Sequence, residues 1–351
     1  MKTLTLGCAI VCALLITGAS GHATGTDISF DVTDATEIFP NAIDSNGNVA
    51  GYIATTLATG TEKNTLGFVR DSTTTNVTTF STPAQAPFTS ETVVWGMNSS
   101  GIVVGDGYYS FGQHRGFVRS QDGLTFTLTD VAGSGATGDS SARAINDNGT
   151  VVGTWNAPGS PYKNGFVMSG GGFTSFLAPN PSHKVITINT IPTAVDSSGN
   201  VAGTTDDSLF ETHIFLRNTR GRISTFDIPG ATSITVTKLN DSGLISGHYN
   251  NGSVELAFTL TTSKKSVFTS FAGAGGATAT LANDLNLVGL VLGSYTTDGT
   301  NYHGFTRDSS GTVSFVNMGG STSTIPLAFN TGGSIAGYYI DGTGAHGFIR
   351  P

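Results

Sequence analysis

AINDNGTVVG, residues Ala144 to Gly153, is one copy of a ten-residue pattern that decides the fold of this chain. The pattern is a small residue, an apolar residue, Asn or Asp, two variable residues, Gly, and then a short apolar run that ends in a second Gly. Seven copies occur, at Ala42 to Gly51, Gly96 to Gly105, Ala144 to Gly153, Ala194 to Gly203, Lys238 to Gly247, Asp284 to Gly293 and Ala328 to Gly337. Their last glycines are 54, 48, 50, 44, 46 and 44 residues apart. A period of roughly 40 to 50 residues is typical of a four-stranded propeller blade.

Each copy predicts a β-hairpin, followed by two further strands. Gly in the Asn/Asp-x-x-Gly turn supplies a positive φ, and the Asn or Asp side chain can cap the turn. A second apolar segment follows, such as GFVR at Gly116 or HGFIR at His346, and then a fourth strand such as RISTF at Arg222. We therefore expect four strands, A to D, in every unit.

The two ends of the chain predict that these units close into a ring. The seventh unit stops at Arg350 after its third strand, whereas DISFDVTDATEIF, which starts at Asp27, matches the missing fourth strand. Pairing of Ile28 to Val32 with His346 to Arg350 would leave no free sheet edge. The predicted fold is an all-β, seven-bladed propeller of four-stranded antiparallel blades, and a linear array of β-units is the alternative.

The first residues indicate export. MKTLTLGCAIVCALLITGASGHA has one Lys, an apolar run from Leu4 to Ile16 and small residues up to Ala23, which is typical of a signal peptide. We expect residues 1–23 to be removed and residues 24–351 to form a single propeller domain in a secreted or periplasmic protein. Cys8 and Cys12, the only cysteines, lie in the removed segment, so the mature chain has neither disulfides nor thiolate chemistry.

Composition narrows the range of partners. Removing the signal removes one of the 16 Lys and Arg and none of the 24 acids, which gives a mature charge of 15 − 24 = −9. A mildly acidic chain without a basic stripe lacks the electrostatic footprint of a nucleic-acid-binding protein. No later segment is long and apolar enough to span a membrane. We expect a monomer whose partner is a glycan or an extracellular protein.

The repeated pattern resembles the bacterial extracellular repeats of the HAF family. The likeness rests on the seven cores, on His-Gly-Phe at His303 and His346, and on FDIPGA at Phe226. It covers nearly the whole mature chain and implies an exported repeat protein, with no characterised reaction and no catalytic residues to carry over. This chain has His in that register at only three units, His213, His303 and His346, which argues against a role that needs seven histidines.

Departures from the repeat indicate where a ligand could bind. The loops that join D to A and B to C share one face of a propeller, and the B–C loops vary in length, so we assign function to that face. Seven residues before the Asn or Asp, units one to three carry Glu37, Glu91 and Asp139, which are candidate catalytic acids. Four residues further along, on the same face of a regular strand, come Asn41, Trp95 and Arg143.

Two interpretations of these residues stay open. They could be solvated rim residues, with Arg143 neutralising a neighbour. They could instead bind a sugar, a cation or a cationic group, or divide acid and base roles as the carboxylates of glycosidases do, at separations of about 5 to 10 Å.

Other candidates are weaker. Four aromatic residues lie two positions after the last Gly of their copies: Trp155, Tyr249, Tyr295 and Tyr339. They could stack on sugars or fill the space between blades. We interpret the third-strand histidines as structural, and the sequence predicts no metal site and no cofactor. The first hypothesis is a secreted, non-catalytic propeller that binds a carbohydrate, a small ligand or a protein on the D–A and B–C face. The alternative is a glycoside hydrolase or polysaccharide lyase that uses the three acids.

Overall fold

The structure is a computed structural model that describes residues 26–56, 63–82, 91–110, 113–128, 139–157, 159–181, 185–262 and 266–351. The expected signal peptide, residues 1–23, lies outside these ranges. The described part of the chain is all-β and contains no helix that could cross a membrane.

Strand pairing groups the strands into antiparallel units of four, one for each copy of the sequence pattern. Units one to three are β2 (Glu37–Ile43), β3 (Val49–Thr56), β4 (Lys63–Arg70) and β5 (Val77–Phe80); β6 (Thr92–Met97), β7 (Val103–Ser110), β8 (Gln113–Arg119) and β9 (Phe126–Leu128); and β10 (Ser140–Ile145), β11 (Val151–Asn156), β12 (Lys163–Ser169) and β13 (Gly172–Phe176).

Units four to six are β14 (Thr187–Val195), β15 (Val201–Asp207), β16 (Thr212–Arg217) and β17 (Ile223–Phe226); β18 (Ser233–Leu239), β19 (Leu244–Asn250), β20 (Glu255–Thr261) and β21 (Phe268–Phe271); and β22 (Ala279–Leu285), β23 (Val291–Thr296), β24 (His303–Arg307) and β25 (Val313–Phe315). Units five and six form one eight-stranded sheet, because Glu255 and Ala279 make a parallel bridge between β20 and β22.

The last unit combines both ends of the chain. It contains β26 (Ser323–Phe329), β27 (Ile335–Asp341), β28 (Gly344–Arg350) and, as its fourth strand, β1 (Ile28–Phe30). In β1, Ile28 pairs with Ile349 and Phe30 pairs with Gly347. The predicted pairing of the N-terminal segment with the last strand is therefore confirmed over these three residues, while Val32 lies beyond the strand with its side chain buried.

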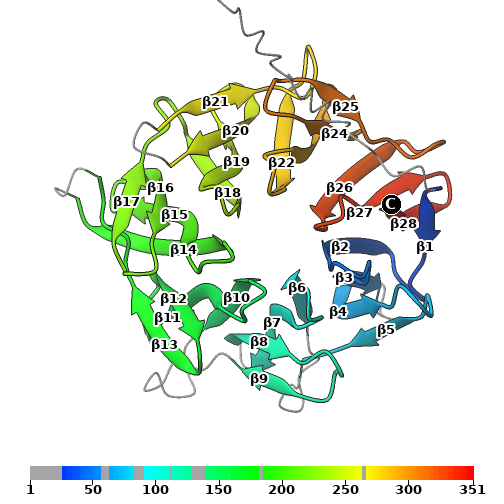
Figure 1. The fold of residues 1–351 in the computed structure, drawn as a ribbon, viewed down its shortest axis with the longest axis horizontal. Helices are drawn as coiled ribbons and strands as arrows, with labels where there is room; N and C mark the ends of the chain where they lie inside the picture. The colour runs from blue at the N-terminus through cyan, green and yellow to red at the C-terminus, as the bar shows by residue number, and fades with distance from the viewer. Residues whose placement is uncertain are drawn as a thin grey trace, which may run out of the picture.

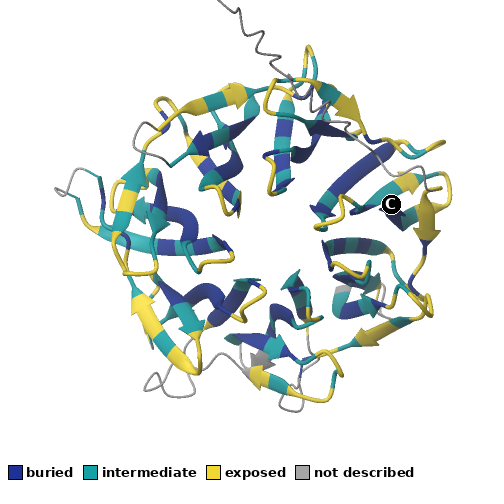
Figure 2. Ribbon diagram, in the orientation of Figure 1, coloured by how far each residue is buried: buried dark blue, intermediate teal, exposed yellow. Residues whose placement is uncertain are grey.

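The units are arranged radially around a common centre, with the first strand of each unit innermost (Figure 1). Burial follows the same arrangement, because most buried residues lie on the first three strands of each unit, whereas the fourth strands are almost entirely intermediate or exposed (Figure 2). The arrangement is propeller-like, and each unit buries both faces of its sheet against its neighbours.

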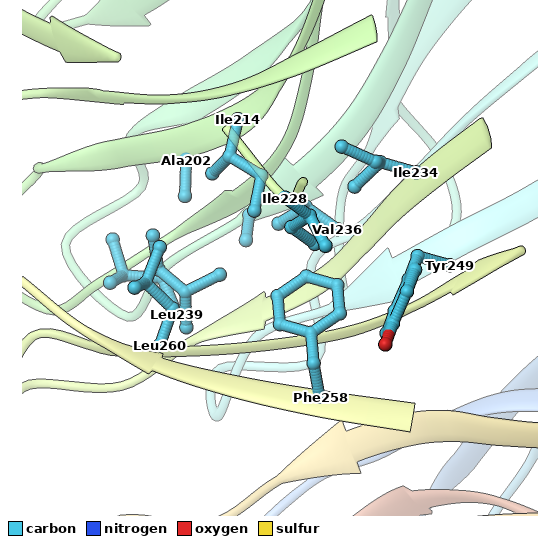
Figure 3. Packing of buried hydrophobic residues seen from close by; sticks show 11 residues of the cluster. Ala202, Ile214, Ile228, Ile234, Val236, Leu239, Tyr249, Phe258 and Leu260 are labelled. Carbon is cyan, nitrogen blue, oxygen red and sulfur yellow. The ribbon is translucent and has the colours of Figure 1, made fainter. Parts of the chain in front are cut away.

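One phenylalanine from each third strand occupies the middle of each unit. These seven side chains have no exposed surface: Phe68, Phe117, Phe166, Phe215, Phe258, Phe305 and Phe348. Burying each one stabilises the fold by about 1.5–3 kcal/mol. Figure 3 shows one packed cluster, in which Ala202 and Ile214 of unit four meet Val236, Leu239 and Phe258 of unit five.

The core glycine is required by a close approach between strands. A Cβ atom on Gly153 would lie 1.9 Å from the carbonyl oxygen of Ser141 and 2.9 Å from the ring of Phe166. The last glycine of each of the other six copies lies equally close to its inner strand, so a side chain there would collide with backbone.

The Asn or Asp of the pattern caps its own turn, as predicted, and Asn98, Asn146, Asn240 and Asn330 also bridge to the next unit. In unit three, Asn146 Oδ1 accepts a hydrogen bond from the backbone N–H of Thr150 at 2.8 Å, and Gly149 has φ 76°. Asn146 Nδ2 donates to the carbonyl oxygen of Asp196 in unit four, also at 2.8 Å. Asn330 Nδ2 of the last unit donates to the Asp44 carbonyl of unit one at 3.1 Å, which links the two ends of the repeat series.

Candidate functional site

Each innermost strand contains a β-bulge at the same position of the repeat. The bulge residue is the extra residue between two paired positions, and in unit three the pairing passes from Ala142 to Ala144 across Arg143. The residues at this position are Asn41, Trp95, Arg143, Thr193, Thr237, Asn283 and Leu327, and in unit one Pro40 is unpaired as well. A bulge re-aims the side chain that it contains. Strand alternation, on which the sequence analysis relied, therefore does not set the direction of Asn41, Trp95 or Arg143.

Three bulge residues fasten neighbouring inner strands together. Asn41 Nδ2 donates to the carbonyl oxygen of Val94 at 2.8 Å, which joins unit one to unit two. Thr193 and Asn283 make the equivalent bonds to Val236 and Pro326, each at 2.7 Å. The structure thus places Asn41, a candidate ligand-binding residue, in a bridge between two units.

Trp95 and Arg143 occupy the same bulge position but make a different arrangement. The guanidinium carbon of Arg143 lies 4.4 Å from the centre of the Trp95 ring, in a cation–π contact between units two and three. Trp95 Nε1 donates a hydrogen bond to Asp106 Oδ1, and Ser141 Oγ donates to the same oxygen at 2.6 Å. These four side chains, together with His114, are called the Trp95 cluster below.

Asp106 is the charged centre of the Trp95 cluster. Burial alone would raise the pKa of this carboxyl group, but hydrogen bonds from His114, Ser141 and Trp95 and the positive charge of Arg143 lower it. Asp106 is therefore ionised at neutral pH and accepts hydrogen bonds. Burial also lowers the pKa of Arg143, against the charge of Asp106, which raises it.

His114 lies at the solvent side of the cluster. Its Nδ1 is 3.7 Å from Asp106 Oδ2, and its backbone N–H donates to Asp139 Oδ1 at 3.0 Å. The interaction with Asp106 raises the pKa of His114, burial opposes this, and the charges of Asp139 and Glu91 add to the rise. The structure thus brings two of the three candidate acids, Glu91 and Asp139, into the surroundings of one histidine.

Glu37 belongs to a separate group. The Phe39 ring stacks on Tyr52 at 4.7 Å between ring centres and meets Tyr338 of the last unit edge-on at 5.4 Å. Burial raises the pKa of Tyr52 and of Tyr338, and the charge of Glu37 raises both further. Glu37 therefore lies beside a tyrosine pair between the last and first units, and its electrostatic partners differ from those of Glu91 and Asp139.

The four aromatic candidates lie in four different units and pack toward the outer strands. Trp155 Nε1 donates to Ser175 Oγ on β13, Tyr249 Oη bonds Ser270 Oγ on β21, and Tyr339 Oη bonds Ser29 Oγ on β1. Tyr295 contacts the rings of His303, Phe305 and Phe315. The structure does not bring them together with Trp95.

Sequence reasoning missed Asp106, Ser141 and His114. A usable signal was present, because the residue directly after each core glycine pairs with the inner strand and differs between units: Tyr52, Asp106, Thr154, Thr204, His248, Ser294 and Tyr338. Asp106 is the one acid in this series.

Two cavities of the described structure lie away from the Trp95 cluster. One, of about 540 Å³, lies among the A–B turns at the opposite end of the inner strands and is lined by Asp44, Asn146, Asp196, Asn240 and Asn330, among others. The other, of about 860 Å³, lies between the segment after β1 and the outer strands of unit one. Among the described residues, Asp207, Glu211 and His213 have the atoms and spacing to hold a metal ion, and they lie on unit four.

Comparisons with known proteins give the fold. No family profile and no curated protein sequence matches the chain. The structure is similar to an acylaminoacyl peptidase of Pyrococcus horikoshii, with a TM-score of 0.55 and 11% identity over 92% of this chain and 52% of that one. It is also similar to dipeptidyl peptidase 4 of Porphyromonas gingivalis, with a TM-score of 0.51 and 9% identity over 85% of this chain and 48% of that one.

The fucose-specific lectin of Aleuria aurantia gives a TM-score of 0.43 and 9% identity, over 82% of this chain and 96% of that one. The chain spans about half the length of the two peptidases that it matches. At identities this low, the likeness to the peptidases concerns the fold alone, and it assigns the chain to a propeller-like arrangement of four-stranded antiparallel sheets.

Proposed function

We propose that this chain is an exported, seven-bladed β-propeller, closed by β1, that binds a carbohydrate without cleaving it. The ligand would lie at the Trp95 cluster, between units two and three, on the face that the sequence analysis assigned to ligand binding. The export proposal rests on the signal-like residues 1–23, and the closed ring is supported by the β1–β28 pairing and the Asn330–Asp44 bond.

The observation that carries the proposal is the contact of Trp95 with Asp106 and Arg143. Binding sites combine apolar surface with a few fixed polar groups, and Trp95 is a half-buried aromatic residue of the inner strand β6 with such groups beside it. Asp106 and Ser141 hold the ring in place, while the guanidinium of Arg143 covers it and carries hydrogen-bond donors.

The charges around the cluster favour a neutral, hydroxyl-rich ligand. Glu91 and Asp139 are exposed to solvent and offer acceptors for hydroxyl groups, and Arg143 and His114 offer donors. Three carboxylates surround the two basic groups, so an anionic ligand is disfavoured. A sugar, which has both donors and acceptors and an apolar face, matches this mixture.

A second candidate function is the hydrolysis or lysis of a glycan. His114, with its raised pKa, beside Asp139 and Glu91 is the feature that favours it, because an acid and a base near one sugar are what such reactions require. Asp106 does not supply the acid, because its lowered pKa keeps it ionised. Glu37 has other electrostatic partners, so the two carboxylates left for that chemistry are Glu91 and Asp139.

The test is a glycan screen read out by tryptophan fluorescence and by product detection. The chain has two tryptophans, so Trp155→Phe leaves Trp95 as the only one in the protein. We expect a bound glycan to change the Trp95 emission in Trp155→Phe and to leave the emission of Trp95→Phe unchanged. Binding that survives in Trp95→Ala contradicts the proposed site, and product release that stops in Glu91→Gln supports the enzyme.

A further inference from the structure

The turn between β15 and β16 brings three metal-ligating side chains together. Asp207 ends β15, Glu211 precedes β16, and His213 is the second residue of β16. One ligand atom from each residue lies within 4.8 Å of the others. Asp207 is 1% exposed and His213 is 8% exposed, whereas Glu211 is open to solvent. A metal ion could therefore enter from the solvent side and reach two buried ligands.

His213 is held in the orientation that metal-binding histidines need. Its Nδ1 contacts Asp227 Oδ1 at 2.6 Å. Asp227 directly follows β17, the fourth strand of the same unit. When Nδ1 carries the proton of this bond, Nε2 presents its lone pair to Asp207. Metal-ligating histidines generally donate their second ring N–H to such a carboxylate, which fixes the ring and raises the basicity of the ligating nitrogen.

The distance between the two buried ligand atoms suits one shared ion. His213 Nε2 lies 3.6 Å from Asp207 Oδ2. Two ligands at about 2.1 Å from a tetrahedral ion are about 3.4 Å apart, so only a small shift is required. Asn180 Nδ2 now contacts both atoms, at 2.8 Å from Asp207 Oδ2 and 3.3 Å from His213 Nε2. Rotation of this amide would turn its oxygen toward the ion.

Asp207 is prepared as an anionic ligand. Its Oδ1 accepts the backbone N–H groups of Leu209 and Glu211 at 2.8 and 3.0 Å, which leaves Oδ2 for the site. Asp207 is thus fixed through Oδ1, while Oδ2 faces Asn180 and His213.

The last unit provides an internal comparison. His346 has the same place in its unit, its Nδ1 contacts Asp31 at 2.6 Å, and its Nε2 lies 3.3 Å from Asp341 Oδ1. The turn there is shorter and runs directly from Asp341 to Gly344, so it has no counterpart of Glu211. The last unit thus has counterparts of Asp207 and His213, namely Asp341 and His346, but none of Glu211.

We propose that Asp207, Glu211 and His213 form a binding site for a divalent transition-metal ion, of which Zn²⁺ is the probe. One imidazole nitrogen with carboxylate oxygens is a ligand set of zinc and of neighbouring metals, while Ca²⁺ and Mg²⁺ prefer oxygen ligands alone. The bound ion would fix the turn that presents Leu209 and Phe210, whose side chains are 65% and 81% exposed.

The test is calorimetric titration of Zn²⁺ into the full mature chain, without a histidine tag and after dialysis against a chelator. We expect one equivalent to bind and the melting temperature to rise with it. Glu211→Gln, which changes an exposed side chain, and Asp227→Asn are each expected to weaken zinc binding at least tenfold, as removal of a ligand or of its supporting carboxylate does.

His346→Gln is the matched control, because it removes the histidine of the incomplete site. Zinc affinity unchanged in His346→Gln but reduced in Glu211→Gln supports the proposal. Failure of the wild-type chain to bind zinc, or loss of the bound equivalent in His346→Gln with retention in Glu211→Gln, overturns it. A lower melting temperature in Asp227→Asn with unchanged zinc affinity also overturns the proposal. In that case the contact between Asp227 and His213 stabilises the fold but does not support a metal ligand.

Discussion

Arg350 forms a bidentate ion pair with Asp27, with Nε 2.8 Å from Oδ1 and Nη2 2.6 Å from Oδ2. The pair joins the C-terminal end of β28 to the residue that precedes β1. With Phe30, which packs against Phe68 at 6.1 Å between ring centres, it holds a strand of only three residues in place. The three-residue strand β1 is thus held by a side-chain contact at each end as well as by its pairing with β28.

A chain that begins after Phe30 should be less stable and should regain stability when the missing strand is supplied separately. Its exposed β28 edge is expected to lower the melting temperature and to promote aggregation. A peptide of residues 26–36 should bind this shortened chain, and calorimetry or a thermal melt measures the effect. The same peptide with Phe30→Ser is the control and should bind at least tenfold more weakly; equal binding would contradict closure by β1.

The contact of His346 with Asp31 should make stability depend on pH. The hydrogen bond to Asp31 raises the pKa of His346, burial opposes it, and Asp341 adds to the rise. A raised folded pKa means that this contribution is fully present below the ordinary histidine value of about 6.5 and is lost as the pH rises through the folded pKa. Asp31→Asn should therefore destabilise the protein more at pH 6 than at pH 9, measured by denaturant unfolding.

Tyr339, whose ring stacks on His346, and Thr343, which bonds Nε2, also face this imidazole. The charged side chains that contact it are the carboxylates of Asp31 and Asp341. If Asp31→Asn destabilises the protein equally at the two pH values, the charge of His346 does not contribute to the stability of its contact with Asp31.

Gly153→Ala should cost at least about 1–3 kcal/mol of unfolding free energy, because the added methyl group collides with the Ser141 carbonyl. Gly172→Ala is the control, since its nearest contact is an ordinary one at 3.4 Å from the Ser169 carbonyl. Urea unfolding of the two variants measures the difference. A Gly153→Ala protein as stable as Gly172→Ala would contradict the close packing of the second strand on the inner strand.

Asp106→Asn should shift the titration of His114. The interaction with Asp106 is the first cause of the raised pKa of His114, so removing the charge should move it back toward the ordinary value. The imidazole resonance in an NMR pH titration reports the change directly. Asp122→Asn, at an exposed carboxylate of the β8–β9 turn, is the control and should leave His114 unchanged.

The scaffold could be predicted because the repeat fixes its turns and the number of strands in each unit. The Asn/Asp-x-x-Gly turn fixes a hairpin wherever it occurs, and the spare strand at Ile28 had one unpaired position left to fill, beside Ile349. The turn is a property of one short stretch, whereas the pairing of Ile28 with Ile349 follows from the count of strands in each unit, and the structure has both.

The site was harder to predict because every unit has the bulge at the same repeat position. The spacing between the inner-strand residues and the Asn or Asp is therefore constant and does not reveal the bulge. Arg143 and Trp95 were expected on one face by alternation, whereas they meet because each is the extra residue of its strand. Asp106 lies on the second strand, so an inspection of inner strands alone could not find it. Glu37 shares its repeat position with Glu91, but its surroundings depend on Tyr338, which is about 300 residues away in the chain.

The bulge position separates ligand contact from folding. Its residues stand outside the ladder of paired positions, and three of them, Asn41, Thr193 and Asn283, bond to a neighbouring inner strand. Trp95, Arg143, Thr237 and Leu327 make no hydrogen bond to a neighbouring unit among the residues that the structure describes. A combinatorial library randomised at these four places would therefore vary the chemistry presented at the centre of the ring while leaving the framework intact, and new specificities could be selected from it.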